Sequence, residues 1–253
     1  MAAGHHRLYL PGDTPVHRLP PEAKLAAAVA FAIAVVATPR TALWAFAAHA
    51  ALLAAVAAIA RVPPGFLLRR MAIEIPFVAF ALALPFIGLG ERVEVAGLGL
   101  SVEGLWAAWN VLAKATLGVT ASILLAATTE PHRILHGARR LRIPSLLVQI
   151  AMFMLRYLDV ILGEMRRMRI ARESRGFTAR DLRAAPVLAR SVGALFIRSY
   201  ERGERVHLAM LSRGFTGTLP VLDDRPAPPA AWVAALSPAV AAAVVAALAR
   251  VVA

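Results

Sequence analysis

The stretch LWAAWNVLAKATLGVTASILLAA, from Leu105 to Ala127, holds one charged residue, Lys114. A helix rises 1.5 Å per residue, so roughly 20 apolar residues cross the ~30 Å hydrocarbon core of a bilayer. This stretch is long enough to cross, and polar sequence resumes at Glu130. It therefore predicts a membrane-spanning helix.

Four more apolar runs, each bounded by proline, glycine or charge, lie on either side of this stretch. They cover residues 25–38, 42–60, 71–90 and 231–252. The first is short for a full crossing, so we expect it to use residues 21–24 as well or to tilt against its neighbour. Tryptophans near the ends of the runs match the aromatic belts at membrane interfaces; they are Trp44, Trp106, Trp109 and Trp232. The runs predict an all-α fold, a polytopic membrane helix bundle of about five transmembrane helices.

The overall composition supports a membrane protein and excludes several kinds of chemistry. Hydrophobic residues make up 59% of the chain, yet its formal net charge is +13 and its pI is about 11.6, a combination that soluble domains rarely show. The chain has no cysteine, which excludes disulfides, thiolate catalysis and cysteine-ligated metal sites. A phosphate-binding loop needs a lysine followed by serine or threonine, but Lys24 and Lys114 are followed by Leu25 and Ala115. We therefore expect a chain that is not an enzyme and binds no cofactor itself.

The charges of the loops predict the orientation of the chain. The N-terminal tail lacks a secretory signal, and Arg7, Arg18 and Lys24 precede the first apolar run. Arginines also lie between the second and third runs, whereas the loop before the fourth run is mostly acidic. Because positive loops stay inside, we expect a multi-pass protein of the cell (inner or plasma) membrane with a cytosolic N-terminus and an external C-terminus.

The polar, arginine-rich insert between the fourth and fifth runs predicts a separate cytosolic domain. The expected domains are residues 1–127, 128–225 and 226–253. Proline boundaries and helical spacing predict insert helices over about 131–143, 145–175 and 186–213. In the second of these helices one apolar stripe is formed by Met154, Leu158, Ile161, Met165 and Met168. We expect these long amphipathic helices to lie along the membrane surface or to pack on one another, with their arginines in water or against anionic headgroups.

One five-residue motif, Ser-Arg-Gly-Phe-Thr, ends two of the predicted helices, at residues 174–178 and again at residues 212–216. Glycine just after a helix favours the left-handed C′ position, and an arginine before it complements the negative end of the helix dipole. Helix capping explains the Arg-Gly pair but leaves the matching Phe and Thr unexplained. Two equivalent helix ends favour two equivalent binding sites on other molecules.

These motifs resemble those of the transmembrane (T) component of energy-coupling factor (ECF) transporters, the CbiQ/EcfT family, whose hallmark is a pair of Ala-Arg-Gly-like motifs. Here the motifs read Ser174-Arg175-Gly176 and Ser212-Arg213-Gly214, with serine at the first position. The similarity extends over nearly the whole chain, through PGDTPVHRLPPEAKL, LLAATTEPHRILHGARRLRIP and the two basic helices. The basic helices look most like the cobalt/nickel branch of the family, and a T component for a vitamin such as biotin, thiamin or riboflavin is the alternative.

The resemblance implies the partners of the chain. In this family the T component joins a membrane substrate-binding (S) component and two ABC-type ATPase subunits, and each motif enters a groove on one ATPase subunit. ATP and magnesium are then used by the ATPase subunits, and the insert is a coupling domain that carries their movement to the S component. The resemblance makes Lys114 and the stripe residues Met154, Leu158, Ile161 and Met165 candidate S-component contacts.

Other polar residues have competing interpretations. Lys114, within a predicted span, fits helix–helix hydrogen bonding as well as it fits contact with an S component. His132 and His136 have a spacing that can share a metal ion, but no third spaced ligand accompanies them, so we predict no metal site. The sequence assigns no role to His49. Glu164 is expected to form ion pairs inside the insert.

Two other classes of function remain possible from the charge pattern. Basic helices could bind phosphate headgroups in an integral membrane protein that binds or modifies lipid, although no catalytic cluster near the interface supports an enzyme. The insert could also attract nucleic acid, but aromatic residues for base stacking are sparse in it. We therefore expect the lipid bilayer and transporter subunits as partners, and no nucleic acid.

Overall fold

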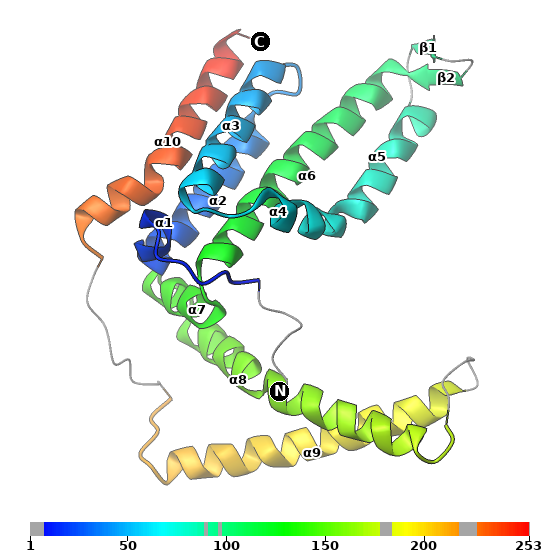
Figure 1. The fold of residues 1–253 in the computed structure, drawn as a ribbon, viewed down its shortest axis with the longest axis vertical. Helices are drawn as coiled ribbons and strands as arrows, with labels where there is room; N and C mark the ends of the chain where they lie inside the picture. Colours follow the sequence, from blue (N-terminus) through cyan, green and yellow to red (C-terminus); the bar gives the residue numbers. More distant parts are fainter. Residues whose placement is uncertain (1–7, 89–90, 96–97, 178–183, 218–226, 253) are drawn as a thin grey trace. The chain divides into compact units, whose positions relative to one another are not determined.

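A computed structural model describes residues 8–88, 91–95, 98–177, 184–217 and 227–252 of the chain. The described residues are almost entirely helical and form two compact units (Figure 1). The first unit contains residues 1–141 and 225–253, and the second contains residues 142–224. The first unit extends past the expected domain boundary at Ala127 because the helix that follows packs on the bundle.

The first unit contains α1 (Pro15–Arg18), α2 (Pro21–Ala37), α3 (Leu43–Ile59), α4 (Pro64–Arg70), the 3₁₀ helix η1 (Met71–Glu74), α5 (Ile75–Ile87), β1 (Arg92–Val95), β2 (Leu98–Ser101), α6 (Val102–Thr128), α7 (Pro131–Arg140) and α10 (Pro229–Val252). The second unit contains α8 (Ser145–Glu173) and α9 (Ala185–Leu211). In the first unit α10 and α7 pack on α2, and α6 packs on both α2 and α5.

Among the described residues, four helical segments are long and apolar enough to cross a membrane, which confirms the polytopic all-α fold. They are Pro64–Ile87, Val102–Thr128, Ser145–Glu173 and Pro229–Val252, and Leu43–Ile59 is a shorter apolar helix. The run at residues 25–38 corresponds to the 17-residue helix α2, which ends one residue earlier at Ala37 and is not one of the four. Ser145–Glu173 was expected outside the membrane. It meets the same criterion because Gln149 is the only polar residue between Leu146 and Leu155.

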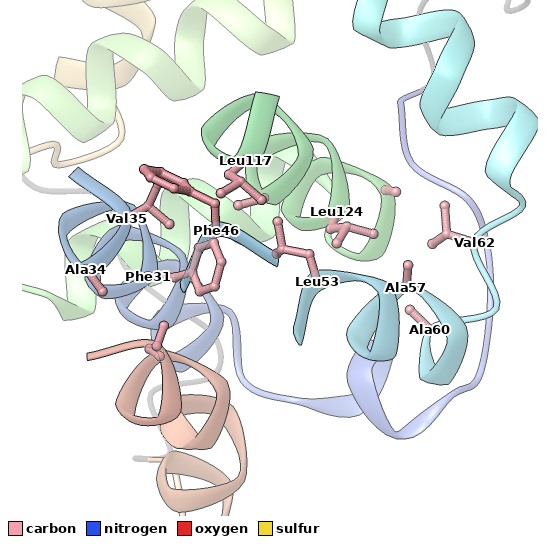
Figure 2. Packing of buried hydrophobic residues seen from close by; sticks show 14 residues of the cluster. Phe31, Ala34, Val35, Phe46, Leu53, Ala57, Ala60, Val62, Leu117 and Leu124 are labelled. Carbon is pink, nitrogen blue, oxygen red and sulfur yellow. The ribbon is translucent and has the colours of Figure 1, made fainter. Parts of the chain in front are cut away.

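The core of the first unit lies where α2, α3, α6 and α10 meet. Figure 2 shows its larger side chains, among which Phe31 and Val35 of α2, Phe46 of α3 and Leu117 of α6 converge. Alanine fills much of the remaining contact, and Ala242 of α10 is fully buried. Small side chains let helix backbones approach closely, which is how helices associate where lipid surrounds them.

His49 of α3 is fully buried in this core and is fixed by a hydrogen bond to α2. The Thr38 hydroxyl lies 3.0 Å from Ala34 O and 3.0 Å from His49 Nε2. A hydroxyl has one proton, which it donates to the carbonyl, so His49 Nε2 must be the donor in the second bond. The imidazole also packs edge to face against the Phe31 ring, with the two ring centroids 5.8 Å apart. His49 therefore joins α3 to the end of α2.

The polar loop before α6 contains a small antiparallel hairpin that the sequence analysis did not predict. β1 pairs with β2 so that Arg92 lies opposite Ser101 and Val93 lies opposite Leu100. Apolar and polar residues alternate along Arg-Val-Glu-Val, which is the strand period of two, but the strands are shorter than most. Ser101 then starts α6, because its side chain accepts a hydrogen bond from the Gly104 amide at 3.2 Å.

Helix α7 is fastened to the start of α2 at two points, and the end of α6 is bound to α2 beside them. A Cβ on Gly137 would stand 2.7 Å from the Glu22 amide nitrogen, so only glycine permits the two backbones to approach this closely. Arg140 Nη1 forms an ion pair with Glu22 Oε1 at 2.7 Å. Beside it, the buried Lys24 ammonium donates to the Thr128 carbonyl at 2.9 Å and thereby complements the negative end of α6.

Candidate functional site

The first motif ends α8 in a Schellman cap. The Phe177 amide donates to the Arg172 carbonyl at 3.1 Å, and the Gly176 amide donates to the Glu173 carbonyl at 3.0 Å. These are the two hydrogen bonds that define this cap, and Gly176 has the left-handed φ of +76° that it requires. Thr178, the last residue of this copy, lies outside the described residues.

The second motif ends α9 with the same hydrogen bonds. The Phe215 amide donates to the Met210 carbonyl at 3.1 Å, and the Gly214 amide donates to the Leu211 carbonyl at 3.0 Å. Gly214 has a φ of +80°. The C′ positions predicted for Gly176 and Gly214 are confirmed. The repeated Phe is also explained, because it occupies the C″ position, where an apolar side chain packs back on the last turn.

The capping geometry leaves one side chain of each motif without a partner. The Ser174 and Ser212 hydroxyls donate to carbonyls of their own helices, at 3.1 and 2.9 Å. Arg175 and Arg213 are exposed, and neither guanidinium forms a hydrogen bond or an ion pair with any residue that the structure describes. A guanidinium is a planar fork of donors that can bind a carboxylate in a bidentate way. The arginines are therefore the groups of the motif that can bind another molecule.

The two motifs lie at opposite ends of the second unit. α8 and α9 run in opposite directions (Figure 1), so the end of one helix lies beside the start of the other. Gln149, in the second turn of α8, donates to the Gly217 carbonyl just beyond the second motif at 3.0 Å. Farther along, Glu164 of α8 forms ion pairs with Arg198 and Arg202 of α9. Each motif therefore lies at a different end of the helix pair.

An apolar crevice of about 490 Å³ separates α8 from α9. From α8 it is lined by Phe153, Tyr157 and Ile161, and from the α9 side by Met210 and Phe215 among others. Sequence periodicity predicted a neighbouring stripe of α8 instead of this face, although the four-residue spacing of these side chains is also helical and Ile161 belongs to both.

Most of that predicted stripe faces away from α9. Met154 is 68% exposed, Leu158 is 48% exposed and Met165 is 46% exposed, whereas Ile161 lines the crevice. Met154, Leu158 and Met165 are therefore exposed apolar surface in the described chain. The assignment of the stripe as an S-component contact stays a prediction.

Lys114 of α6 forms the helix–helix bond that was one of its two interpretations. Its Nζ donates to the Val36 carbonyl near the end of α2 at 2.9 Å. The bond satisfies a carbonyl that the helix end leaves without an intrahelical partner. Lys114 thus holds α6 to α2, and its contact with an S component stays a prediction.

No group of three or more potential ligands among His, Cys, Asp and Glu comes together within the described residues. His132 and His136 both lie on α7. Burial, together with the positive charge of Arg139 and of His132, lowers the pKa of His136. A basic surrounding of this kind also disfavours a cation at the pair.

Comparison with known proteins gives consistent matches. The family model described as cobalt transport protein, CbiQ, matches residues 12–222. A cobalt transport protein CbiQ of Rhodobacter capsulatus is 28% identical over 168 residues, covering 66% of this chain and 67% of that protein. An energy-coupling factor transporter transmembrane protein EcfT of Bacillus selenitireducens is 31% identical over 229 residues, covering 83% of this chain and 82% of that protein. An uncharacterised protein of Methanocaldococcus jannaschii is 33% identical over 105 residues, 42% of this chain and 39% of its own length.

Proposed function

The chain belongs to the CbiQ/EcfT family of transmembrane transporter components, and from this premise we propose that it couples ATP hydrolysis by two partner ATPase subunits to movement of a membrane S component. The chain itself is a non-catalytic subunit, and ATP and Mg²⁺ are used by the partners. The observation that carries the proposal is the pair of identical helix caps, each of which presents an exposed arginine without a partner in the described chain.

The geometry of the caps supports docking by two separate subunits. Ser174 and Gly176 fix the backbone on both sides of Arg175, and Ser212 and Gly214 do the same for Arg213. An arginine on a rigid helix end loses little backbone entropy when it binds, so more of the binding energy is retained. Because the two ends point away from each other along an antiparallel pair, one ATPase subunit can bind at each end.

For the substrate we propose cobalt or nickel, taken up through the S component rather than bound by this chain. The description of the matching family and the name of the relative from Rhodobacter capsulatus both refer to cobalt transport. The relative from Bacillus selenitireducens has a name that refers to no substrate, so a vitamin importer is the second candidate. Uptake of radiolabelled cobalt, nickel and biotin by cells that express the whole transporter distinguishes the two.

We further propose that the N-terminus and the second unit are cytosolic and that α8 lies along the membrane surface. Charge favours this orientation, because α8 carries several exposed arginines from Arg166 onward. A single cysteine in place of the exposed Ala171 tests the proposal cleanly, since the native chain has no cysteine. An impermeant maleimide should label it only after the cells are opened. Labelling in intact cells would show that α8 crosses the membrane.

The main test of the proposed function is the composition of the complex. The chain should be recovered in detergent with two ATPase subunits, as measured by native mass spectrometry, and should hydrolyse no ATP by itself. A stable preparation of the chain that hydrolyses ATP without partners would contradict the proposal.

A further inference from the structure

Glu164 is the one buried charged side chain among the described residues of the second unit, with 7% of its surface exposed. Its Oε1 accepts a hydrogen bond from Arg198 Nη1 at 3.1 Å, and its Oε2 accepts one from Arg202 Nη2 at 3.3 Å. Arg198 and Arg202 lie one turn apart on α9, so they face the same carboxylate. We call these three residues the clamp.

The clamp adds a directional interaction to the contact between α8 and α9, which is otherwise mostly apolar. The crevice between α8 and α9 is lined chiefly by aliphatic and aromatic side chains. Apolar burial is non-directional, so it allows one helix to slide or rotate on the other. A buried carboxylate between two guanidiniums has a defined geometry, and removal of its partners leaves a buried charge without compensation. The clamp, together with the hydrogen bond from Gln149 to the Gly217 carbonyl, therefore favours one register of α8 against α9.

The clamp lies between the two arginine motifs, and its Glu164–Arg202 pair is equally far along the helices from both. Glu164 precedes Ser174 on α8 by the same number of residues as Arg202 precedes Ser212 on α9. In each case the separation corresponds to about 15 Å of helix. Because the two helices run in opposite directions, the motifs lie on opposite sides of the clamp. A rotation about this pair displaces the two motifs in opposite senses and opens the hydrogen bond from Gln149 to the Gly217 carbonyl.

We propose that the clamp is the pivot on which α8 and α9 turn, and that Glu164 is the positioning residue that transmits movement of one motif to the other. This inference rests on the proposed function. Two arginines a turn apart suit a pivot, because the carboxylate keeps one charge-assisted bond to either while the helices rotate. Arg202 Nη1 is buried and has no hydrogen-bond partner among the described residues, so it is a spare donor for the shifting carboxylate.

A distance measurement in the assembled complex tests the pivot. Spin labels at Ala171→Cys and Ala209→Cys lie on exposed positions of α8 and α9, equally far from the clamp. In the complex with its ATPase subunits, a non-hydrolysable ATP analogue should shift the distance between the labels. Glu164→Gln keeps the shape of the side chain and removes its charge. It should broaden the distance distribution and abolish the shift, while the ATPase subunits remain bound.

Glu201→Gln is the matched control, because Glu201 forms an exposed pair with Arg205 at 3.9 Å and should leave the shift intact. Arg198→Gln combined with Arg202→Gln removes the same contact from α9 and replaces Glu164→Gln if that variant fails to insert. A normal shift in the clamp variants overturns the pivot, as does loss of ATPase binding, which would make the clamp a purely structural contact. Failure of the unsubstituted chain to bind ATPase subunits counts against the proposed function instead.

Discussion

The ends of α8 and α9 share one backbone cap but differ in what lies beneath it. At the end of α9, Phe215 lines the crevice and Gln149 of α8 donates to the Gly217 carbonyl. At the end of α8, Phe177 is partly buried and lines no such crevice in the described chain. Within the described residues, the tip of α9 therefore contacts α8, whereas the cap hydrogen bonds of the α8 tip are all within its own helix. Identical motifs specify the local geometry, and the neighbouring helix decides how firmly that geometry is held.

The largest effect is expected where the two ends act alike. Arg175→Glu combined with Arg213→Glu should abolish recruitment of the ATPase subunits, because loss of one partner from a buried charge pair costs about 2 to 5 kcal/mol at each end. A role in capping alone would cost only about 0.3 to 1 kcal/mol. Pull-down of tagged ATPase subunits measures the effect.

The single variants refine that test of equivalence. Arg175→Glu and Arg213→Glu should each leave one ATPase subunit bound, which native mass spectrometry can count. Lysine at either position should rescue poorly, because a point charge does not reproduce the planar fork. Normal recruitment by the double variant would reduce both motifs to helix caps.

Substitution of the two motif phenylalanines should destabilise the two helix ends to different extents. Phe215→Ala removes a side chain from the crevice and should destabilise the end of α9 by about 2 kcal/mol, below the 3 to 5 kcal/mol typical of fully buried aromatic residues. Phe177→Ala should cost about half as much, since that ring is not part of the crevice between α8 and α9. Hydrogen exchange of the amides in each last turn measures both, at about tenfold in protection per 1.4 kcal/mol. Equal losses would show that the crevice does not anchor the second motif.

Substitution of the two motif glycines should destabilise the two helix ends equally. Gly176→Ala and Gly214→Ala should each cost about 1 kcal/mol, because an L-residue is strained at the left-handed φ that both positions have. A Cβ would meet no atom within 4 Å at either site, so strain is the only cost. Hydrogen exchange at the two caps should therefore change by the same factor. A difference would reveal a contact specific to one end.

The smallest effect should be confined to one end. Gln149→Met keeps the length of the side chain and removes the donor to the Gly217 carbonyl. Loss of one exposed, neutral hydrogen bond should cost about 0.5 kcal/mol. Exchange should quicken slightly at the second motif and stay unchanged at the first, which serves as the internal control. An equal change at both would mean that Gln149 stabilises α8 rather than the tip of α9.

The features that could be predicted from the sequence are those whose cause lies within a few residues. The caps at Gly176 and Gly214 follow from local backbone chemistry, and both are confirmed. The same cap ends α3, where the Val62 amide donates to the Ala57 carbonyl at 3.0 Å, but Arg61 occupies the left-handed position with a φ of +54°. Without glycine as a signal, that cap could not be recognised.

Contacts between distant residues could not be predicted in the same way. α8 carries two overlapping apolar faces, one through Met154 and Leu158 and one through Phe153 and Tyr157, and periodicity alone does not show which one meets α9. Glu164 was expected to form an ion pair, but its two arginines are on another helix. The apolar first half of α8 also satisfies a membrane criterion that its arginine-rich second half obscures.

The attachment of α7 to α2 has a mechanical consequence. The chain leaves the first unit through α7 and returns to it through α10, and both of these helices pack on α2. The two covalent connections to the second unit therefore enter two different helices, α7 and α10, that share α2 as a neighbour. At the first connection, Gly137 and the Arg140–Glu22 ion pair leave α7 little freedom to slip. α2 thus contacts both of the helices through which the chain leaves and re-enters the first unit.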